Sequence, residues 1–150
     1  MTKIIKDPQY WLMQFDLEAT EVDVGRWKTK RWSIAKLNLP RTEEECSGEQ
    51  ISLPLELFKD ERTDYRFNLS SRDPHLFFIF EVKDDESLKP LKVTASQTNA
   101  ASFMDGDYLV QSVPMPLPVQ AWMEAFIGRH GELLEVRKKK RKGAGRASGN

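Results

Sequence analysis

Trp11-Leu12-Met13-Gln14-Phe15-Asp16-Leu17 is the stretch that decides the fold. Its largest apolar side chains stand at every second position, which is typical of a strand that buries one face. Gly25 then marks a turn, and a second aromatic segment follows at residues 27–39. The sequence therefore predicts an early hairpin.

The second segment changes phase within itself. Trp32 and Ile34 share one face of a regular strand, whereas Ala35 and Leu37 share the other. A β-bulge near residues 34–35 would bring these apolar side chains to the same face.

Strand chemistry continues along most of the chain. Further strands are predicted at residues 51–57, 65–69, 75–82, 91–95 and 108–113. Pro54 lies opposite the apolar face of its strand, where its missing N–H is tolerated at a sheet edge. Residues 40–50 show no apolar period and predict an exposed acidic loop that contains an accessible Cys46.

Helical spacing appears clearly once. It joins Val119, Trp122, Met123, Phe126 and Ile127, and predicts a helix near residues 118–130 that starts at Pro118 and stops at Gly131. A shorter helix capped by Ser96 is predicted before a turn at residues 105–107. The predicted fold is mainly β (α+β): a small antiparallel sheet or partly open barrel of about six or seven strands, covered by the C-terminal helix.

Charge is divided unevenly along the 150 residues, although the formal net charge is zero. Residues 131–150 carry seven basic and two acidic residues, which leaves residues 1–130 with 16 basic and 21 acidic ones. The chain is therefore predicted to form one mainly β domain over residues 1–136, followed by a flexible basic tail at residues 137–150.

Local motifs for catalysis or metal binding are missing from the sequence. The one cysteine has no thiol neighbour, and the two histidines, His75 and His130, are expected to be structural. Phosphate-binding glycine loops and the spacings of zinc or calcium ligands are not found either. We therefore expect no enzyme activity, no catalytic or metal residues and no cofactor. No signal peptide or spanning segment is recognised, so a cytoplasmic protein without membrane contact is expected.

Two segments are candidates for binding a partner. In the first, two tryptophans alternate with cations; in the second, cations follow one another near the C-terminus. The candidate residues are Trp27, Lys28, Lys30, Arg31, Trp32, Arg137, Lys138, Lys139, Lys140, Arg141 and Lys142. The tryptophan spacing sends the two rings to opposite faces of a strand, so one of them is expected in the core. The basic run is equally consistent with a solvated tail.

One family resemblance rests on the order of short landmarks between about residues 25 and 141. These landmarks are Trp27 and Trp32, residues 53–57, Tyr65 with residues 68–70, residues 93–96, residues 113–116, and Trp122 through Phe126 to residues 129–130 before the basic run. The chain resembles domain-of-unknown-function family 3305, small bacterial proteins encoded near formate dehydrogenase components. Asn99 and Val136 depart from that pattern, which usually has an acidic and an aromatic residue there.

The resemblance implies an accessory role in formate metabolism, such as maturation or assembly of a molybdenum enzyme. The leading hypothesis is a non-catalytic adaptor that binds a formate dehydrogenase component through residues 27–32, residues 114–118 or the basic tail. The alternative is a nucleic-acid-binding module in which the tail supplies charge and an exposed tryptophan stacks on bases. The acidic remainder of the chain argues against this alternative.

Overall fold

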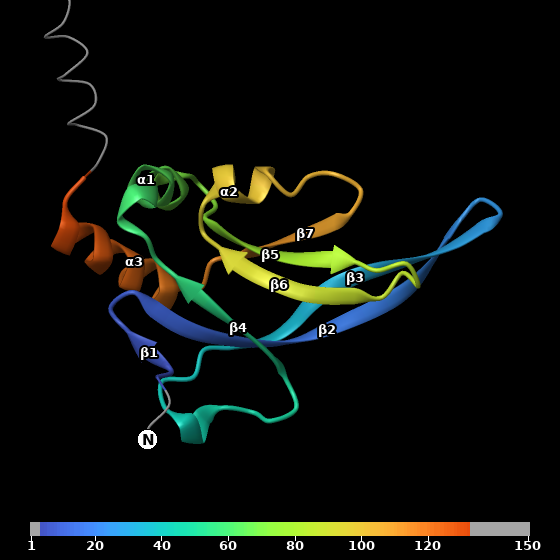
Figure 1. Cartoon of the computed structure of the whole chain (residues 1–150), viewed down its shortest axis with the longest axis horizontal. Helices are drawn as coiled ribbons and strands as arrows, with labels where there is room; N and C mark the ends of the chain where they lie inside the picture. The colour runs from blue at the N-terminus through green and yellow to red at the C-terminus, as the bar shows by residue number, and fades with distance from the viewer. Residues whose placement is uncertain (1–3, 133–150) are drawn as a thin grey trace, which may run out of the picture.

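The computed structural model describes residues 4–132 as a seven-stranded open sheet with helices packed against it (Figure 1). The strands are β1 (Lys6–Asp7), β2 (Tyr10–Val24), β3 (Trp27–Asn38), β4 (Ile51–Glu56), β5 (His75–Val82), β6 (Leu88–Thr94) and β7 (Tyr108–Pro114). The helices are α1 (Arg62–Ser70), α2 (Gln97–Ala101) and α3 (Leu117–His130), with short 3-10 turns at Glu43–Glu45 and Lys59–Glu61. The predicted mainly β fold with a C-terminal helix is confirmed.

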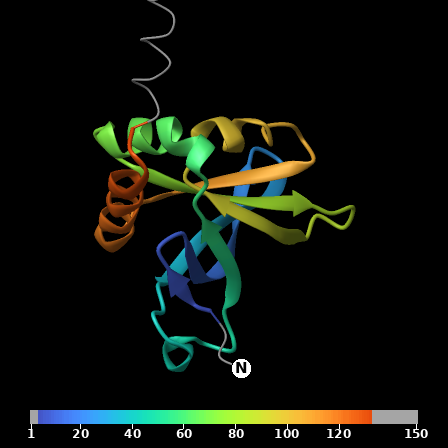
Figure 2. The same cartoon turned by 60° about the vertical axis from the view of Figure 1, so that its left-hand side comes forward.

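The strand order is β1-β2-β4-β6-β5-β7, and β3 pairs with β2 on the side away from β4. All pairings are antiparallel except that of β4 with β6, which consists of one residue pair, Leu55 with Val93. The outer strands β3 and β7 contact each other. The sheet therefore curls toward a partly open barrel (Figure 2).

The early hairpin is confirmed, and its predicted bulge lies slightly later than expected. Gln14 faces Asn38 and Asp16 faces Ala35, so β3 holds one more residue than β2 between these pairs. Within this bulge Lys36 has a φ of 53°. The bulge thus lies at residues 36–37 instead of the predicted residues 34–35. Its extra residue brings the apolar side chains of β3 back to the inward face.

Pro54 meets the expectation of an edge position on one side of its strand. β4 pairs with β2 along its whole length, with Leu12 opposite Pro54. Toward β6 it pairs only at Leu55, so the preceding residues of β4 form an edge on that side within the described chain. An interior strand can hold a proline under these conditions.

The predicted strand at residues 65–69 is wrong, because these residues belong to α1. Tyr65 and Asn68 are buried and stand three residues apart, whereas the intervening Phe67 is 67% exposed. Asn68 donates through Nδ2 to the His75 and Ala95 carbonyls, at 2.7 and 2.9 Å, and accepts from the His75 N–H at 3.0 Å. The alternation of Tyr65, Phe67 and Leu69 was a coincidence within a helical pattern of period 3.6.

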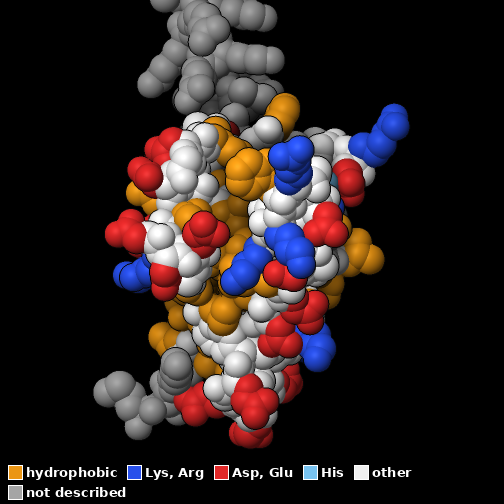
Figure 3. Space-filling model, turned by 90° about the vertical axis from the view of Figure 1, so that its right-hand side faces the viewer, with side chains coloured by type: hydrophobic (Ala, Val, Ile, Leu, Met, Phe, Trp, Pro, Cys, Tyr) orange, Lys and Arg blue, Asp and Glu red, His pale blue; other side chains and the backbone are white. Residues whose placement is uncertain are grey.

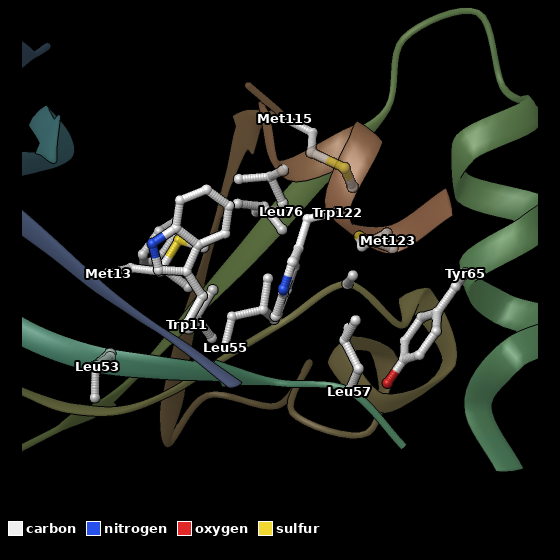
Figure 4. Packing of buried hydrophobic residues seen from close by; sticks show 14 of the residues in the cluster. Trp11, Met13, Leu53, Leu55, Leu57, Tyr65, Leu76, Met115, Trp122 and Met123 are labelled. Carbon is white, nitrogen blue, oxygen red and sulfur yellow. The ribbon is translucent and has the colours of Figure 1, made fainter. Parts of the chain in front are cut away.

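The core lies between the inward face of the sheet and α3, whose five predicted apolar residues are all buried (Figure 4). Trp11 of β2 meets Trp122 of α3 edge to face, with 5.4 Å between ring centroids. Their indole N–H groups donate to the carbonyls of Pro40 and Asp7, each at 2.8 Å. Both rings thus bury their apolar surface without leaving a polar atom unsatisfied. Gly131 ends α3 as predicted, with a φ of 83°.

The shorter predicted elements are also found. Ser96 caps α2, and its Oγ accepts from the Asn99 N–H at 3.0 Å. Residues 105–107 form a turn in which Asp105 accepts from the Asp107 N–H. The loop at residues 40–50 is largely exposed, although Cys46 is half-buried and its Sγ donates to the Thr42 carbonyl.

Candidate interaction surface

The ends of β2 and β3 extend past the other strands as a two-stranded arm, here residues 17–34 (Figure 1). At its base Leu17 pairs with Ile34, and both pack against the core. At its tip Val24 pairs with Trp27, and these side chains are 55% and 76% exposed. The arm thus begins inside the core and ends in solvent.

A two-residue turn closes the arm between Val24 and Trp27. Gly25 has a φ of 62° there, and Arg26 keeps a negative φ. A glycine in the left-handed region at the first turn position fits the right-handed twist of a tight hairpin. Gly25 therefore allows the tight turn that joins β2 to β3 at the tip of the arm.

The two faces of the arm carry different residues, and only the inner face continues the core-facing side of β2. Met13, Phe15 and Leu17 alternate inward along β2, and the next residues on that face are Ala19 and Glu21. The inner face of the arm consists of Ala19, Glu21, Asp23, Lys28, Lys30 and Trp32. The outer face consists of Glu18, Thr20, Val22, Val24, Trp27, Thr29, Arg31 and Ser33. The inner face of the arm thus continues the core-facing side of the sheet beyond the other strands.

The two candidate tryptophans lie on opposite faces, as their spacing predicts. The expectation that one of them is a core residue is wrong, because Trp32 is only half-buried and Trp27 is largely exposed. Lys30 places its Nζ 5.8 Å from the centroid of the Trp32 ring. Lys28, Lys30 and Trp32 therefore share one surface, whereas Trp27 and Arg31 share the other.

Carboxylates on β2 lie directly across from two of the arm's four cations. Glu21 faces Lys30, and Asp23 faces Lys28. Opposite charges at such positions stabilise an antiparallel pair. The cations that stand out in the sequence are thus partly neutralised by their own hairpin, and the arm is not a uniformly basic surface.

Of the other two candidate segments, the structure describes one, and it lies apart from the arm. Residues 137–142 are outside the described residues. In the segment at residues 114–118, Met115 is buried and Leu117 is 76% exposed at the start of α3. Figure 1 places α3 and the arm at opposite ends of the molecule.

A polar cluster beneath α1 and α2 was not predicted from the sequence. Tyr65 donates to Glu61 Oε1 at 2.7 Å, and Ser96 donates to Asp64 Oδ2 at 2.6 Å. Burial, and then the bond to Glu61, raise the pKa of Tyr65 far above its ordinary value. A helical spacing in the sequence could have indicated this cluster, but the strand prediction at residues 65–69 concealed it. That spacing joins Glu61, Asp64, Tyr65 and Asn68.

A groove of about 240 Å³ adjoins this cluster. It is lined by Pro54, Glu56, Phe58, Asn99 and residues 91–94. Lys92 donates to Asn99 Oδ1 at 3.4 Å, and Asn99 donates to Glu61 at 3.2 Å. Two polar side chains that line the groove thus bond each other, and Asn99 also links the groove to the cluster.

The two histidines occupy the ends of elements. His75 begins β5, with its Nε2 3.8 Å from Asp73 Oδ2. His130 ends α3, and its pKa is lowered by desolvation and then by the nearby charges of Lys59, Arg129 and Arg62. The carbonyl of His130 accepts from Arg62, which supplies the cation at this helix end.

Neither a metal-binding cluster nor a membrane-spanning helix occurs in the described residues. In residues 4–132, His, Cys, Asp and Glu side chains form no group of three suited to a metal ion. The helices of that same part of the chain are all too short or too polar to cross a membrane.

Comparison with known proteins gives one match. No curated protein and no solved structure matches the chain. A family described as a protein of unknown function (DUF3305) matches residues 17–141. The match starts at the base of the arm, before the landmark range that begins at about residue 25, and continues past the end of α3. Because it spans most of the sequence, the chain belongs to this family of proteins of unknown function.

Proposed function

We propose that the chain is a non-catalytic accessory or adaptor protein that binds a protein partner through its arm. We further propose that it acts in the bacterial cytoplasm on a component of formate dehydrogenase, in the maturation or assembly of that molybdenum enzyme. The arm supports the first proposal, and the resemblance of the sequence landmarks supports the second.

The exposed Trp27 at the tip of the arm is the observation that carries the proposal. Tryptophan is among the residues that contribute most to protein interfaces, and it is costly to leave in water. Here its side chain is 76% exposed beside Val24, on a ribbon only two strands wide. Such a ribbon is marginally stable alone in water. A partner that covers Trp27 would bury its surface and support both strands.

Nucleic-acid binding is the weaker alternative, and Trp27 is also the feature that favours it, because an exposed indole can stack on a base. The carboxylates of Glu21 and Asp23 oppose it, since they lie beside the cations that would contact phosphate. This alternative predicts that binding to single-stranded RNA weakens steeply with salt and with removal of the tail charges.

Affinity capture with the full chain tests the proposal. The tagged chain is incubated with extract of its native cells, and formate dehydrogenase components are identified by mass spectrometry. We expect the wild-type chain to retain such a component and Trp27→Ala to lose it. Phe67→Ala is the matched control, because Phe67 is also largely exposed, at 67%, but lies on α1 and away from the arm.

Gene deletion provides the functional half of the test. We expect formate dehydrogenase activity to fall in the deletion strain, to recover with the wild-type gene and not to recover with the Trp27→Ala gene. The proposal fails if no formate dehydrogenase component is captured and deletion leaves that activity unchanged.

A further inference from the structure

Along the arm, the second edge of β2 has no neighbouring strand within residues 4–132. Residues 10–15 of β2 pair with β4 on that edge, and β4 begins at Ile51, opposite Phe15. From Asp16 to Val24, β2 pairs only with β3 in the described chain. Backbone groups on the free edge are thus available to an added strand, which would continue the line of β4.

The rest of the sheet does not close over this edge. β4 and β6 pair only at Leu55 and Val93, and the two halves of the sheet diverge beyond that pair (Figures 1 and 2). Figure 3 views this end of the molecule and shows hydrophobic side chains in a hollow whose flanks carry charged residues. The free edge is therefore open to solvent.

Acidic residues dominate the free edge, although three of their carboxylates also have a lysine of β3 nearby on the paired side. Asp16 and Glu18 lie on the outer face of β2, and Glu21 and Asp23 lie on its inner face. Residues on a paired strand stand directly opposite one another, and opposite charges there are favourable whereas like charges are not. An added strand would therefore need lysine or arginine opposite these four carboxylates, and apolar residues opposite Leu17 and Ala19.

The same charges weigh against other occupants. Two copies that joined through their β2 edges would set carboxylate against carboxylate. Pairing of β2 with the basic β3 of another copy would be head to tail, which gives open chains instead of a closed dimer. Phosphate groups of a nucleic acid would be repelled.

We propose that the free edge of β2 binds an extended, lysine- or arginine-bearing segment of the partner as an antiparallel strand. This inference rests on the proposed function, because it names the chemistry of the partner at the same arm. Backbone hydrogen bonds supply the attraction, and the four carboxylates select a basic segment and fix its register.

A peptide written from the register of β2 tests the inference on the full chain. The capped probe is Lys-Val-Lys-Thr-Val-Lys-Val-Lys, which places lysine opposite each of the four carboxylates. The control peptide replaces each lysine with glutamate. We expect only the lysine peptide to bind, and amide hydrogen exchange at residues 16–24 to slow when it does.

Two matched variants locate the site. Glu18→Gln combined with Glu21→Gln should weaken peptide binding about threefold to tenfold, because two cross-strand charge pairs are lost. Glu44→Gln combined with Glu49→Gln makes the same change in net charge in the exposed loop, and should leave binding unchanged. Equal binding of both peptides, indifference to the first pair of substitutions, or protection on β3 instead of β2 overturns the inference. Self-association of the chain that the first pair abolishes also overturns it, since the occupant would then be a second copy.

The native partner separates this inference from the proposed function. If the partner is captured through Trp27 and the Glu18→Gln, Glu21→Gln chain captures it equally well, the adaptor proposal stands and the edge inference fails. If the peptide binds as expected but no formate dehydrogenase component is captured, the edge inference stands and the proposed function fails.

Discussion

Individual side chains distinguish the buried interior of this molecule from its exposed arm. Trp11 and Trp122 bury their rings and use their N–H groups, whereas Trp27 and Trp32 are left partly or largely in water. The spacing of cations and tryptophans in the sequence singled out residues 27–32, and the structure shows that these residues lie in the arm. The spacing did not show their exposure, since that depends on how far β2 and β3 continue beyond their neighbours.

Asn68 attaches α1 to the rest of the fold through three hydrogen bonds to backbone groups. Asn68→Ala should lower the free energy of unfolding by about 1–3 kcal/mol, because backbone groups of His75 and Ala95 lose their partner inside the protein. Urea denaturation of the full chain measures this. Phe67→Ala on the same helix is the control, and should cost less than about 0.5 kcal/mol because Phe67 is exposed. Equal effects of both substitutions would contradict this account.

Tyr65 should make stability depend on alkaline pH. Its pKa is raised in the folded chain, so the unfolded chain releases the phenol proton first, near the ordinary value of 10.0. The contribution of Tyr65 is therefore complete below about pH 10 and is lost as pH rises above that value. Urea denaturation between pH 8 and pH 11 should show a decline that Tyr65→Phe reduces; an identical decline in that variant would argue against it.

Elements of this fold were predictable where burial is periodic and unpredictable where position is decided by distant contacts. The alternation in β2 and the helical spacing in α3 are internal to each segment, and both were found. α1 was mistaken for a strand because the apolar alternation within residues 65–69 hid a helical spacing, and because the burial of the polar Asn68 depends on carbonyls in β5 and in the link between β6 and α2. The parallel contact of β4 with β6 also joins distant segments and was missed.

Gly25 is the position at which the arm as an element can be weakened alone. Gly25→Ala should destabilise the tip by about 1 kcal/mol, because alanine resists a φ of 62°. Amide hydrogen exchange should quicken in residues 20–31, and the midpoint of global unfolding should change little because the tip frays locally. Gly48→Ala is the control, since a side chain there also meets open space and φ imposes no strain. Unchanged exchange in the arm would count against this picture.

The whole molecule combines zero net charge with opposite charges at different parts of the chain, −5 over residues 1–130 and +5 over residues 131–150. Proteins near zero net charge associate readily, and an uneven distribution adds direction to that attraction. The sequence shows these charges, but the attraction that they cause acts between whole molecules in solution.

Light scattering should show attraction between full-length chains at 10 mM salt that is lost at 150 mM, as the screening length falls from about 30 Å to about 8 Å. Replacement of Lys138, Lys139 and Lys140 by glutamine should remove most of that attraction. Replacement of three lysines elsewhere, at Lys59, Lys83 and Lys89, is the control and should not. Attraction that survives at 150 mM salt would require a different cause.

The continuity of β2 gives the molecule a mechanical property. Its 15 residues span about 50 Å, with Trp11 in the core at one end and the arm at the other. A load applied at Trp27 travels along the β2–β3 ladder until the bulge at Lys36, where the ladder skips a residue. Gln50 holds the Lys36 carbonyl at 2.8 Å, and Asp16 lies 3.9 Å from the Lys36 ammonium. The bulge at the base of the arm is thus held by both Gln50 and Asp16. A force applied to the tip of the arm is therefore transmitted through β2 to the core.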